Sequence, residues 1–223
     1  GSAFLRMAHH NTKPMIETSI DPLRHLRRHW PLLTVLLPCL LLAAWGEPAR
    51  LLLCYDRVAI AHGEPWRLFT GNFVHMGTGH LLEDMAGLVL LWLLFEDVLA
   101  GWRMPLVICL GALAVGVGLY VGDPQVYWYV GISGALDTLW AVGSLRLLFK
   151  RDRFGWILAA VLAAKLVYEQ CFGALPFSTV ASGGNVIVDA HLYGALAGAL
   201  LGLGDGLVGH RIMRRPSRGG DRT

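Results

Sequence analysis

The eighteen residues at positions 104–121, MPLVICLGALAVGVGLYV, contain no charged side chain. A helix of this length rises about 27 Å, close to the thickness of the hydrocarbon core of a membrane. The whole chain agrees with this local pattern, because 55% of its 223 residues are hydrophobic and only 16% are charged. Soluble domains carry about 25% charged residues. The sequence therefore predicts an integral membrane protein.

Similar apolar runs lie on both sides of this stretch. They predict an all-α fold, a polytopic membrane bundle of six transmembrane helices, with spans at 30–46, 79–100, 104–121, 131–149, 154–171 and 185–208. The short linkers leave no room for a second domain. We therefore expect a cytoplasmic N-terminal segment at 1–29, the six-helix membrane domain at 30–208 and a basic cytoplasmic tail at 209–223.

Basic residues predict the orientation of the spans, since Lys and Arg concentrate on the cytoplasmic side. With the N-terminus inside, fifteen of the nineteen basic residues fall on that side, namely Arg6, Lys13, Arg24, Arg27, Arg28, Arg103, Arg146, Lys150, Arg151, Arg153, Arg211, Arg214, Arg215, Arg218 and Arg222. Both termini are therefore expected in the cytoplasm. The outer loop 47–72 holds Trp66 and Phe69 and is expected to lie in the headgroup layer.

The cysteines and the charge balance exclude several classes of protein. Cys39, Cys54, Cys109 and Cys171 lack metal-finger spacing, and a His-Glu-x-x-His motif is absent. No metal or organic cofactor is expected. Cys54 and Cys171 both fall toward the outer side, so a disulfide between them stays open. Because the orientation explains the positive charge, we expect the lipid bilayer as a partner and no nucleic acid.

Several ionisable side chains lie inside the spans, where they are costly and indicate function. Spans two, four and six begin on the outer side, and His80, Ser133 and His191 each lie within about two turns of that start. This places a serine and two histidines at a common depth of less than ~12 Å. The other polar residues of these regions are His75, Asp84, Asp137, Lys165, Glu169 and Asp189.

Ser133 stands between two glycines in the segment Gly131–Gly134. Glycines around a nucleophile let backbone approach closely, and a similar pattern forms the nucleophile elbow of soluble hydrolases. That elbow needs a preceding strand, which this run is not expected to supply.

The last span carries a small-residue face that allows a neighbouring helix to come close, made of Gly194, Gly198 and Gly202. If that neighbour is span four, His191 reaches Ser133 at hydrogen-bond distance, as general-base activation of a weak nucleophile requires. Packing without chemistry is the alternative explanation of these glycines.

Taken together, these segments resemble the rhomboid intramembrane serine proteases. The matching pieces are Phe73-Val-His75 with Met-Gly-Thr-Gly-His80, then Gly131-Ile-Ser133-Gly, then Ala190-His191 with its downstream glycines, in order along the six spans. The resemblance implies cleavage of peptide bonds in the bilayer, with Ser133 as nucleophile and His191 as general base. It also implies that His80 and the Ser133 backbone amide bind the oxyanion, with Gly131 and His75 in supporting positions.

Within that superfamily the chain is most similar to the rhombosortases. The segments KLVYEQ at 165–170 and VDAHLYGALAG at 188–198 carry this narrower resemblance. Rhombosortases are thought to cut bacterial proteins that end in a Gly-Gly motif, one membrane helix and a basic end. The resemblance implies a bacterial inner-membrane protein with its active site toward the periplasm. Its substrates would be membrane-anchored proteins with a C-terminal transmembrane tail.

Two aspartates depart from the rhomboid pattern. Asp84 stands where most rhomboids have an asparagine donor, and an ionised carboxylate cannot donate to an oxyanion. Asp84 is therefore either protonated or does not bind the oxyanion. Asp137 stands where many rhomboids have a tyrosine that stacks on the histidine. It is predicted either to accept a hydrogen bond from His191, as the third member of a triad, or to share a proton with Asp84 in a buried carboxyl pair.

The remaining polar residues have two interpretations each. Lys165 and Glu169 are spaced i, i+4, which predicts a self-neutralising pair on one helix face or, alternatively, a contact to the backbone or terminus of a substrate. Asp189 is expected to bond a neighbouring amide or to cap the last span.

The sequence as a whole favours an intramembrane serine endopeptidase with a Ser-His dyad. A non-catalytic rhomboid-like protein that binds membrane helices is the alternative, and the two aspartates keep it open. A transporter is disfavoured because the polar residues are confined to the outer third of the spans. A metal site on His80 and Asp84 is a further alternative, since histidine and carboxylate are both zinc ligands.

Overall fold

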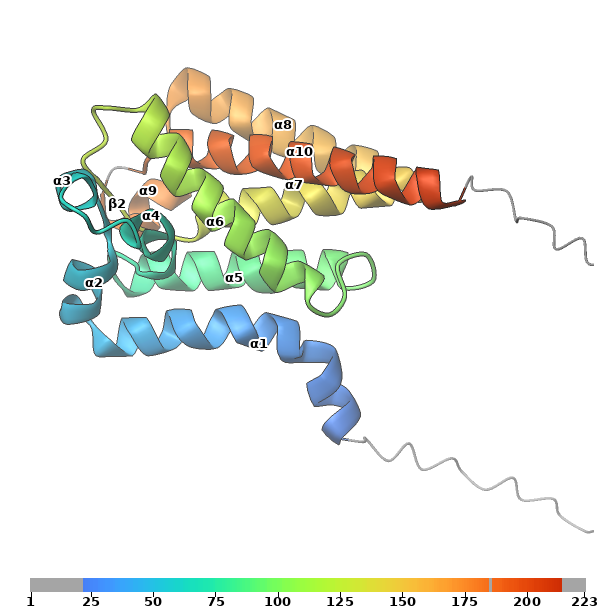
Figure 1. Ribbon diagram of the computed structural model, residues 1–223, viewed down its shortest axis with the longest axis horizontal. Coiled ribbons are helices and arrows are strands. Elements are labelled where there is room, and N and C mark those ends of the chain that lie inside the picture. The colour runs from blue at the N-terminus through green and yellow to red at the C-terminus, as the bar shows by residue number, and fades with distance from the viewer. Residues whose placement is uncertain (1–21, 185, 214–223) are drawn as a thin grey trace, which may run out of the picture.

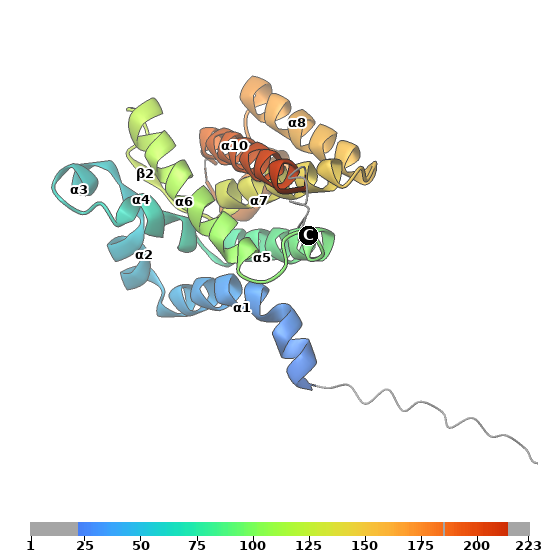
Figure 2. The same cartoon turned by 45° about the vertical axis from the view of Figure 1, so that its right-hand side comes forward.

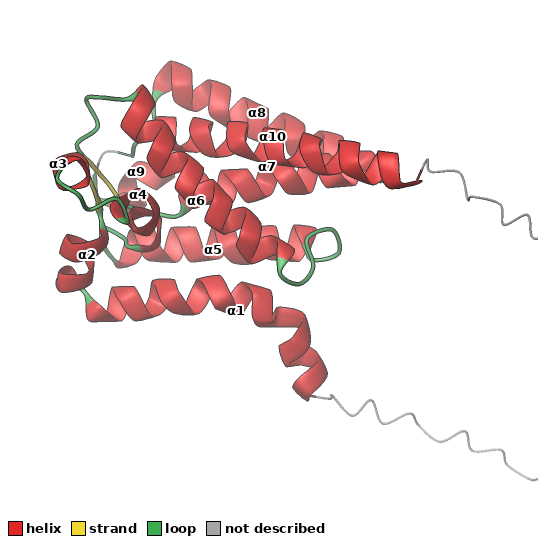
Figure 3. Cartoon of the chain, in the orientation of Figure 1, coloured by secondary structure: helices red, strands yellow, loops and turns green. Residues whose placement is uncertain are grey.

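The computed structural model describes residues 22–184 and 186–213, and their regular structure is almost entirely helical (Figure 3). The long helices are α1 (Pro22–Trp45), α5 (Thr78–Phe95), α6 (Arg103–Gly122), α7 (Ser133–Phe149), α8 (Phe154–Phe172) and α10 (Val188–Met213). The short elements are α2 (Glu47–Leu53), β1 (Tyr55–Asp56), α3 (Arg57–Ala61), α4 (Arg67–Thr70), η1 (Gly71–Phe73), β2 (Trp128–Tyr129) and α9 (Pro176–Ser182). The predicted helical class is confirmed. The predictions for 1–21 and 214–223, including the orientation signal of Arg6 and Lys13, lie outside the described residues.

Helix α7 forms the centre of the bundle. It contacts α5, α6, α8 and α10, while α1 packs beside α5 at the edge (Figures 1 and 2). Eleven of its 17 residues are buried, which is the pattern of a helix enclosed by others rather than one at a surface. The first residue of α7 is Ser133, so the candidate nucleophile lies inside the bundle.

Four helices of the described chain are long and apolar enough to cross a membrane: α5, α6, α8 and the part of α1 from Arg28 to Trp45. Large apolar side chains cover the outside of the bundle, among them Leu41, Val121, Trp156, Phe172 and Leu200. A continuous apolar exterior of this kind marks a surface that faces lipid. The chain is therefore a helical membrane protein, with α7 and α10 packed among the four candidate spans.

The predicted second span, 79–100, is too long at its C-terminal end. Helix α5 stops at Phe95, and the chain then turns at Glu96 and Asp97. Glu96 accepts a hydrogen bond from the guanidinium of Arg28 in α1, and this bond lowers the pKa of the Glu96 carboxyl. The acidic pair ends the helix because two carboxylates favour the aqueous edge of the bundle over its apolar interior.

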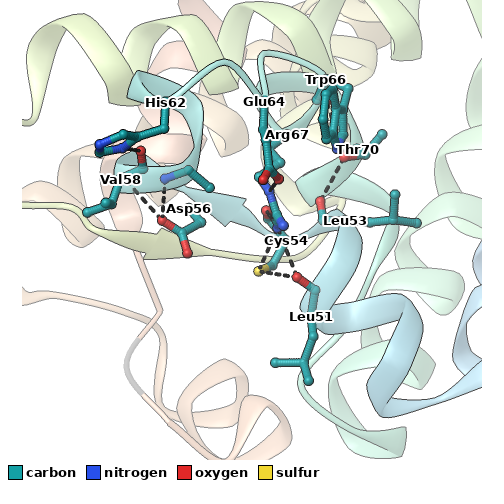
Figure 4. Close-up of polar contacts among 11 residues, drawn as sticks. Leu51, Leu53, Cys54, Asp56, Val58, His62, Glu64, Trp66, Arg67 and Thr70 are labelled. Carbon is teal, nitrogen blue, oxygen red and sulfur yellow. Dashed lines mark hydrogen bonds and ion pairs between the residues drawn. The ribbon is translucent and has the colours of Figure 1, made fainter.

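Hydrogen bonds from one buried arginine, Arg67, hold together the segment between α1 and α5. Arg67, 7% exposed, donates to the carbonyls of Leu51 (2.9 Å) and Cys54 (3.0 Å) and to the carboxylate of Glu64 (2.6 Å), as Figure 4 shows. Thr70 donates to the carbonyl of Leu53 at 2.7 Å. These bonds hold α2 and α4 together at the end of the bundle where Ser133 lies.

A short antiparallel strand pair lies at the same end. Tyr55 pairs with Tyr129 and Asp56 with Trp128, and β2 ends at Tyr129, three residues before Ile132. The expectation that no strand precedes Ser133 is therefore wrong. Two residues are too few to show an alternating pattern in the sequence, and their partner strand lies more than 70 positions earlier in the chain.

The predicted small-residue face of α10 packs against α7. A Cβ atom on Gly194 would lie 1.9 Å from the carbonyl oxygen of Gly134, and one on Gly198 would lie 2.5 Å from that of Thr138. Such distances permit only glycine, because real Cβ contacts lie beyond 3.0 Å. The close approach of the two helices brings the start of α10 to the start of α7.

The disulfide between Cys54 and Cys171, which the sequence left open, does not form. Cys54 is buried beside Arg67 and Cys171 is exposed at the end of α8, and both thiols are free. Burial raises the pKa of the Cys54 thiol, so this side chain is a packing residue rather than a reactive thiolate.

Candidate active site

Ser133 follows a turn whose backbone conformation requires glycine at position 131. Gly131 adopts φ +116°, and a Cβ there would lie 2.6 Å from Cε1 of His80. The Tyr129 hydroxyl donates to the Gly131 carbonyl at 2.6 Å, and the Gly131 amide donates to the Gly71 carbonyl at 3.2 Å. The strand β2 and these two bonds fix the turn, so the serine enters α7 in one defined position.

His191 lies directly against this serine. Its Nε2 is 2.8 Å from Ser133 Oγ, and the His191 residue is 3% exposed. The histidine occupies the first turn of α10, where the contact between Gly194 and Gly134 brings the two helix starts together. The geometry is that of a hydroxyl bonded to the nitrogen that can take its proton.

The other ring nitrogen of His191 contacts Glu169. Nδ1 is 3.0 Å from Glu169 Oε2, and Glu169 is 1% exposed. Asp137 instead accepts a hydrogen bond from Lys165 Nζ at 2.7 Å, and Lys165 also donates to Glu169 Oε2 at 3.0 Å. The first of the two interpretations of Asp137, as the hydrogen-bond partner of His191, is therefore wrong. The predicted Lys165–Glu169 pair forms, but it is one part of a four-residue network.

Asp84 organises a second cluster on the other side of the serine. Its Oδ2 accepts a hydrogen bond from the Ile132 amide at 3.1 Å and lies 3.1 Å from His75 Nε2 and 3.4 Å from His80 Nε2. The rings of His75 and His80 meet edge to face with centroids 5.3 Å apart. Asp84 thus acts as an acceptor that anchors the residue before Ser133.

The predicted carboxyl pair of Asp84 with Asp137 does not form. Asp84 contacts the Ile132 amide and two histidines, whereas Asp137 contacts Lys165. Because each carboxylate has its own hydrogen-bond donor, neither needs to share a proton with the other.

A cavity of about 540 Å³ joins these groups. Its polar lining comprises His80, Glu83, Asp84, Ser133, Asp137, Lys165, Ser178, Ser182 and His191, and the rest is apolar. Helix α9 borders the cavity against α5, where Ser178 donates a hydrogen bond to Glu83. Ser133 and His191 therefore face a mainly apolar space large enough for a short peptide segment.

A metal ion does not fit this site. Asp137, Glu169 and His191 offer ligand atoms within 4.8 Å of one another, the one such group of three in the described residues. The Lys165 ammonium hydrogen-bonds both carboxylates and so fills the position that a cation would take. At the alternative site, the Oδ2 of Asp84 that faces His80 already accepts the Ile132 amide.

Most of the candidate residues lie around Ser133 and His191, and one of them, Asp189, lies apart. Asp189 lies at the edge, where it accepts a hydrogen bond from Gln170 at 3.3 Å. Sequence reasoning missed the contact of Glu169 with His191 and the role of Tyr129. A signal for Glu169 existed: it lies three residues before the end of α8, and His191 lies three residues after the start of α10. Nothing in the sequence marked Tyr129.

Two comparisons with known proteins cover this region. Residues 62–206 match the family model described as Rhomboid domain. The Bacillus subtilis (strain 168) protein named "Putative rhomboid protease YdcA" is 31% identical over 144 residues, which is 65% of this chain and 69% of that protein. The family model spans Ser133, Glu169 and His191, the whole of α5, α7 and α8, and α10 as far as residue 206. The chain therefore belongs to the rhomboid family of intramembrane proteases.

Proposed function

We propose that the protein is an intramembrane serine endopeptidase in which Ser133 is the nucleophile and His191 the general base. The observation that carries the proposal is the 2.8 Å contact between Ser133 Oγ and His191 Nε2 at the wall of the central cavity. A serine hydroxyl is a weak nucleophile until a base takes its proton, and hydrogen-bond reach is the geometric condition.

The reaction follows from this contact. His191 Nε2 takes the Ser133 proton as Oγ bonds to the carbonyl carbon of the substrate. The resulting oxyanion is stabilised by the Ser133 backbone amide and by His80, which lines the same cavity. The C–N bond then breaks, and the His191 imidazolium gives its proton to the leaving amine. Water, deprotonated by His191, hydrolyses the acyl ester and returns Ser133 to its starting form.

A six-span topology fits the arrangement of the long helices. The 17 residues of α7 rise about 26 Å, which approaches the hydrocarbon thickness. The start of α1 and the end of α10 lie at the same end of the bundle, as an even number of crossings requires (Figure 1). With the excess of basic residues placed in the cytoplasm, both termini are cytoplasmic and Ser133 lies toward the periplasmic side of a bacterial inner membrane.

The proposed substrate is an exported protein with a C-terminal Gly-Gly motif, a membrane helix and a basic end. The rhombosortase-like segments 165–170 and 188–198 support this choice, and the first contains both Lys165 and Glu169. Glycine also suits the site physically. A Gly-Gly segment unwinds from a helix more readily than other sequences and places no side chain against the walls of the cavity.

A reporter with such a tail tests the proposal. The purified protein in detergent or liposomes is incubated with a reporter ending in Gly-Gly, one apolar helix and a basic end, and the products are identified by mass spectrometry. We expect cleavage at or beside Gly-Gly by the wild type and none by Ser133→Ala. A matched reporter with Leu-Leu at the site is the specificity control.

The outcomes separate the two levels of the proposal. Cleavage of both reporters would contradict the Gly-Gly specificity but not the protease activity. Cleavage of neither reporter would do the same if Ser133 still reacts with a serine probe. Binding of the intact reporter by a wild type that never reacts with the probe would contradict catalysis and favour a helix-binding protein.

A further inference from the structure

We propose that Glu169 is a positioning residue that fixes the tautomer of His191 and stabilises its imidazolium, so that the site works as a Ser133–His191–Glu169 triad. This inference rests on the proposed function. It goes beyond the Ser-His dyad, because it assigns a catalytic consequence to a buried carboxylate on α8.

The first support is the direction of the hydrogen bonds. An ionised carboxylate only accepts, so Glu169 Oε2, 3.0 Å from His191 Nδ1, requires the proton of the neutral ring to be on Nδ1. Nε2 then presents a lone pair to the Ser133 hydroxyl at 2.8 Å. The tautomer that a general base needs is therefore the one that Glu169 selects.

The second support is the charge of the cluster. With Asp137 and Glu169 ionised and Lys165 protonated, the formal charge around neutral His191 is −1. Proton transfer from Ser133 makes the ring positive and brings that local sum to zero. Because the carboxylates are at most 3% exposed, this interaction is weakly screened.

The third support is an uncompensated oxygen. Glu169 Oε1 is buried and has no hydrogen-bond partner among the described residues. Lys165 already pairs with the other oxygen, Oε2, so the carboxylate has one cation and one oxygen without a hydrogen bond. The imidazolium formed during the reaction also lies beside Oε2 and adds a second cation to this incompletely satisfied carboxylate.

Lys165 and Asp137 keep Glu169 in place. Lys165 Nζ bridges Asp137 Oδ2 at 2.7 Å and Glu169 Oε2 at 3.0 Å, so the carboxylate is tied to both α7 and its own helix. On the opposite side, α5 contributes His80, Glu83 and Asp84 to the cavity. There Asp84 contacts the Ile132 amide and two histidines, and Glu83 accepts a hydrogen bond from Ser178. Among the described carboxylates, Glu169 therefore has the direct contact to the ring, and Asp137 acts through Lys165.

The test compares Glu169→Gln with Asp137→Asn in the detergent-solubilised protein. The rate constant for reaction of Ser133 with a fluorophosphonate is measured from pH 5 to 9. Glu169→Gln keeps the size of the side chain but removes its charge. We expect the rate to fall by roughly 10²–10⁴-fold and the pH of half-maximal rate to move down, because the imidazolium loses its partner.

Asp137→Asn is the matched control, since it neutralises a carboxylate of the same cluster that does not touch the ring. We expect a loss of about tenfold or less and a smaller displacement of the pH profile. A Glu169→Gln profile that keeps the wild-type rate and midpoint would overturn the proposal. So would equal losses in both variants with unmoved midpoints, which indicate a structural role.

A spectroscopic measurement separates this inference from the proposed function. In protein labelled with ¹⁵N-histidine, the resonances of His191 are assigned by their loss in His191→Gln, and their shifts report which nitrogen carries the proton. We expect the Nδ1–H form in the wild type at pH 8 and a mixture in Glu169→Gln. A wild-type Nε2–H form would overturn the inference even if Ser133 reacts. If the wild type shows the Nδ1–H form but Ser133 never reacts with the probe, the proposed protease activity is contradicted and the inference about the tautomer is not.

Discussion

At the scale of single residues, the site depends on a few positions that tolerate no other side chain. Gly131 combines a positive φ with contact to the His80 ring, and both follow from its place between β2 and α7. The sequence singled out the Gly131–Gly134 segment, and the depth of the span starts correctly paired Ser133 with His191. Asp137, one turn from the serine, was one interpretation of the partner of Nδ1, and a carboxyl pair with Asp84 was the alternative role for it. The structure selects Glu169, because helix phase directs Asp137 toward Lys165.

Replacing Gly131 with alanine tests this dependence. The new methyl group would meet His80 at 2.6 Å, and the backbone would have to hold a left-handed conformation that costs L-residues roughly 1–2 kcal/mol. We expect Gly131→Ala to reduce the rate of Ser133 labelling at least about 100-fold, since small displacements of a nucleophile have effects of this size.

Gly77→Ala is the control for Gly131→Ala. Gly77 also precedes a helix of the site, but its backbone is extended and a Cβ there meets nothing within 4 Å. Labelling of Gly77→Ala should stay close to the wild type. A Gly131→Ala variant that labels equally well would contradict the role of the turn.

At the scale of elements, apolar runs predicted the long helices well and the short elements poorly. Hydrophobicity gave the positions of α6 and α8 to within two residues at each end. It extended the second span past Phe95, because Val98 and Leu99 are apolar although the chain has already turned. The strands β1 and β2 were missed, since two paired residues leave no periodic pattern. The contact between α7 and α10 was predictable, because glycines four residues apart form one face of a helix.

The α7–α10 contact predicts opposite effects for two glycines of one helix. Gly194→Ala places a methyl group 1.9 Å from the Gly134 carbonyl, so the helices must separate, at a cost of about 1–3 kcal/mol. Gly204→Ala meets nothing within 4 Å and should leave stability unchanged or raise it by up to about 1 kcal/mol, the difference in helix propensity.

Thermal unfolding in detergent and Ser133 labelling measure both effects. Gly194→Ala should lower the melting temperature and slow labelling, because His191 moves with the start of α10. Equal melting temperatures for Gly194→Ala and Gly204→Ala would show that α7 and α10 are not in close contact.

At the scale of the whole molecule, charged side chains are paired at both ends of the bundle. The end opposite the active site carries the pairs Arg28–Glu96 and Arg146–Asp205. At the active-site end, the buried Arg67 donates to backbone carbonyls and also pairs with Glu64. The distribution of basic residues predicts which end faces the cytoplasm, and this orientation stays a prediction. The sequence could not predict the two pairs at the opposite end, because they join helices that are distant in the chain.

The Arg28–Glu96 pair predicts a pH-dependent contribution to stability. Arg28 lowers the pKa of the Glu96 carboxyl in the folded protein, so the contribution is present above the ordinary carboxyl value of 4.5 and is lost as pH falls through the lower folded value. Arg28→Gln should therefore melt slightly below the wild type at pH 7, and the two should converge near pH 3. The effect is small because the Arg28 side chain is mostly exposed to solvent. A difference that persists at acid pH would contradict an electrostatic origin.

The most direct test of the account is site-resolved labelling by a fluorophosphonate. The wild-type protein in detergent is treated with the probe, digested and analysed by mass spectrometry, beside Ser133→Ala and His191→Ala. We predict that the wild type carries the probe on Ser133 and that labelling disappears in both variants while their melting temperatures stay close to the wild type. A well-folded wild type that remains unlabelled under conditions that label another rhomboid protease, or one labelled at a different serine, would contradict the assignment of Ser133 and His191.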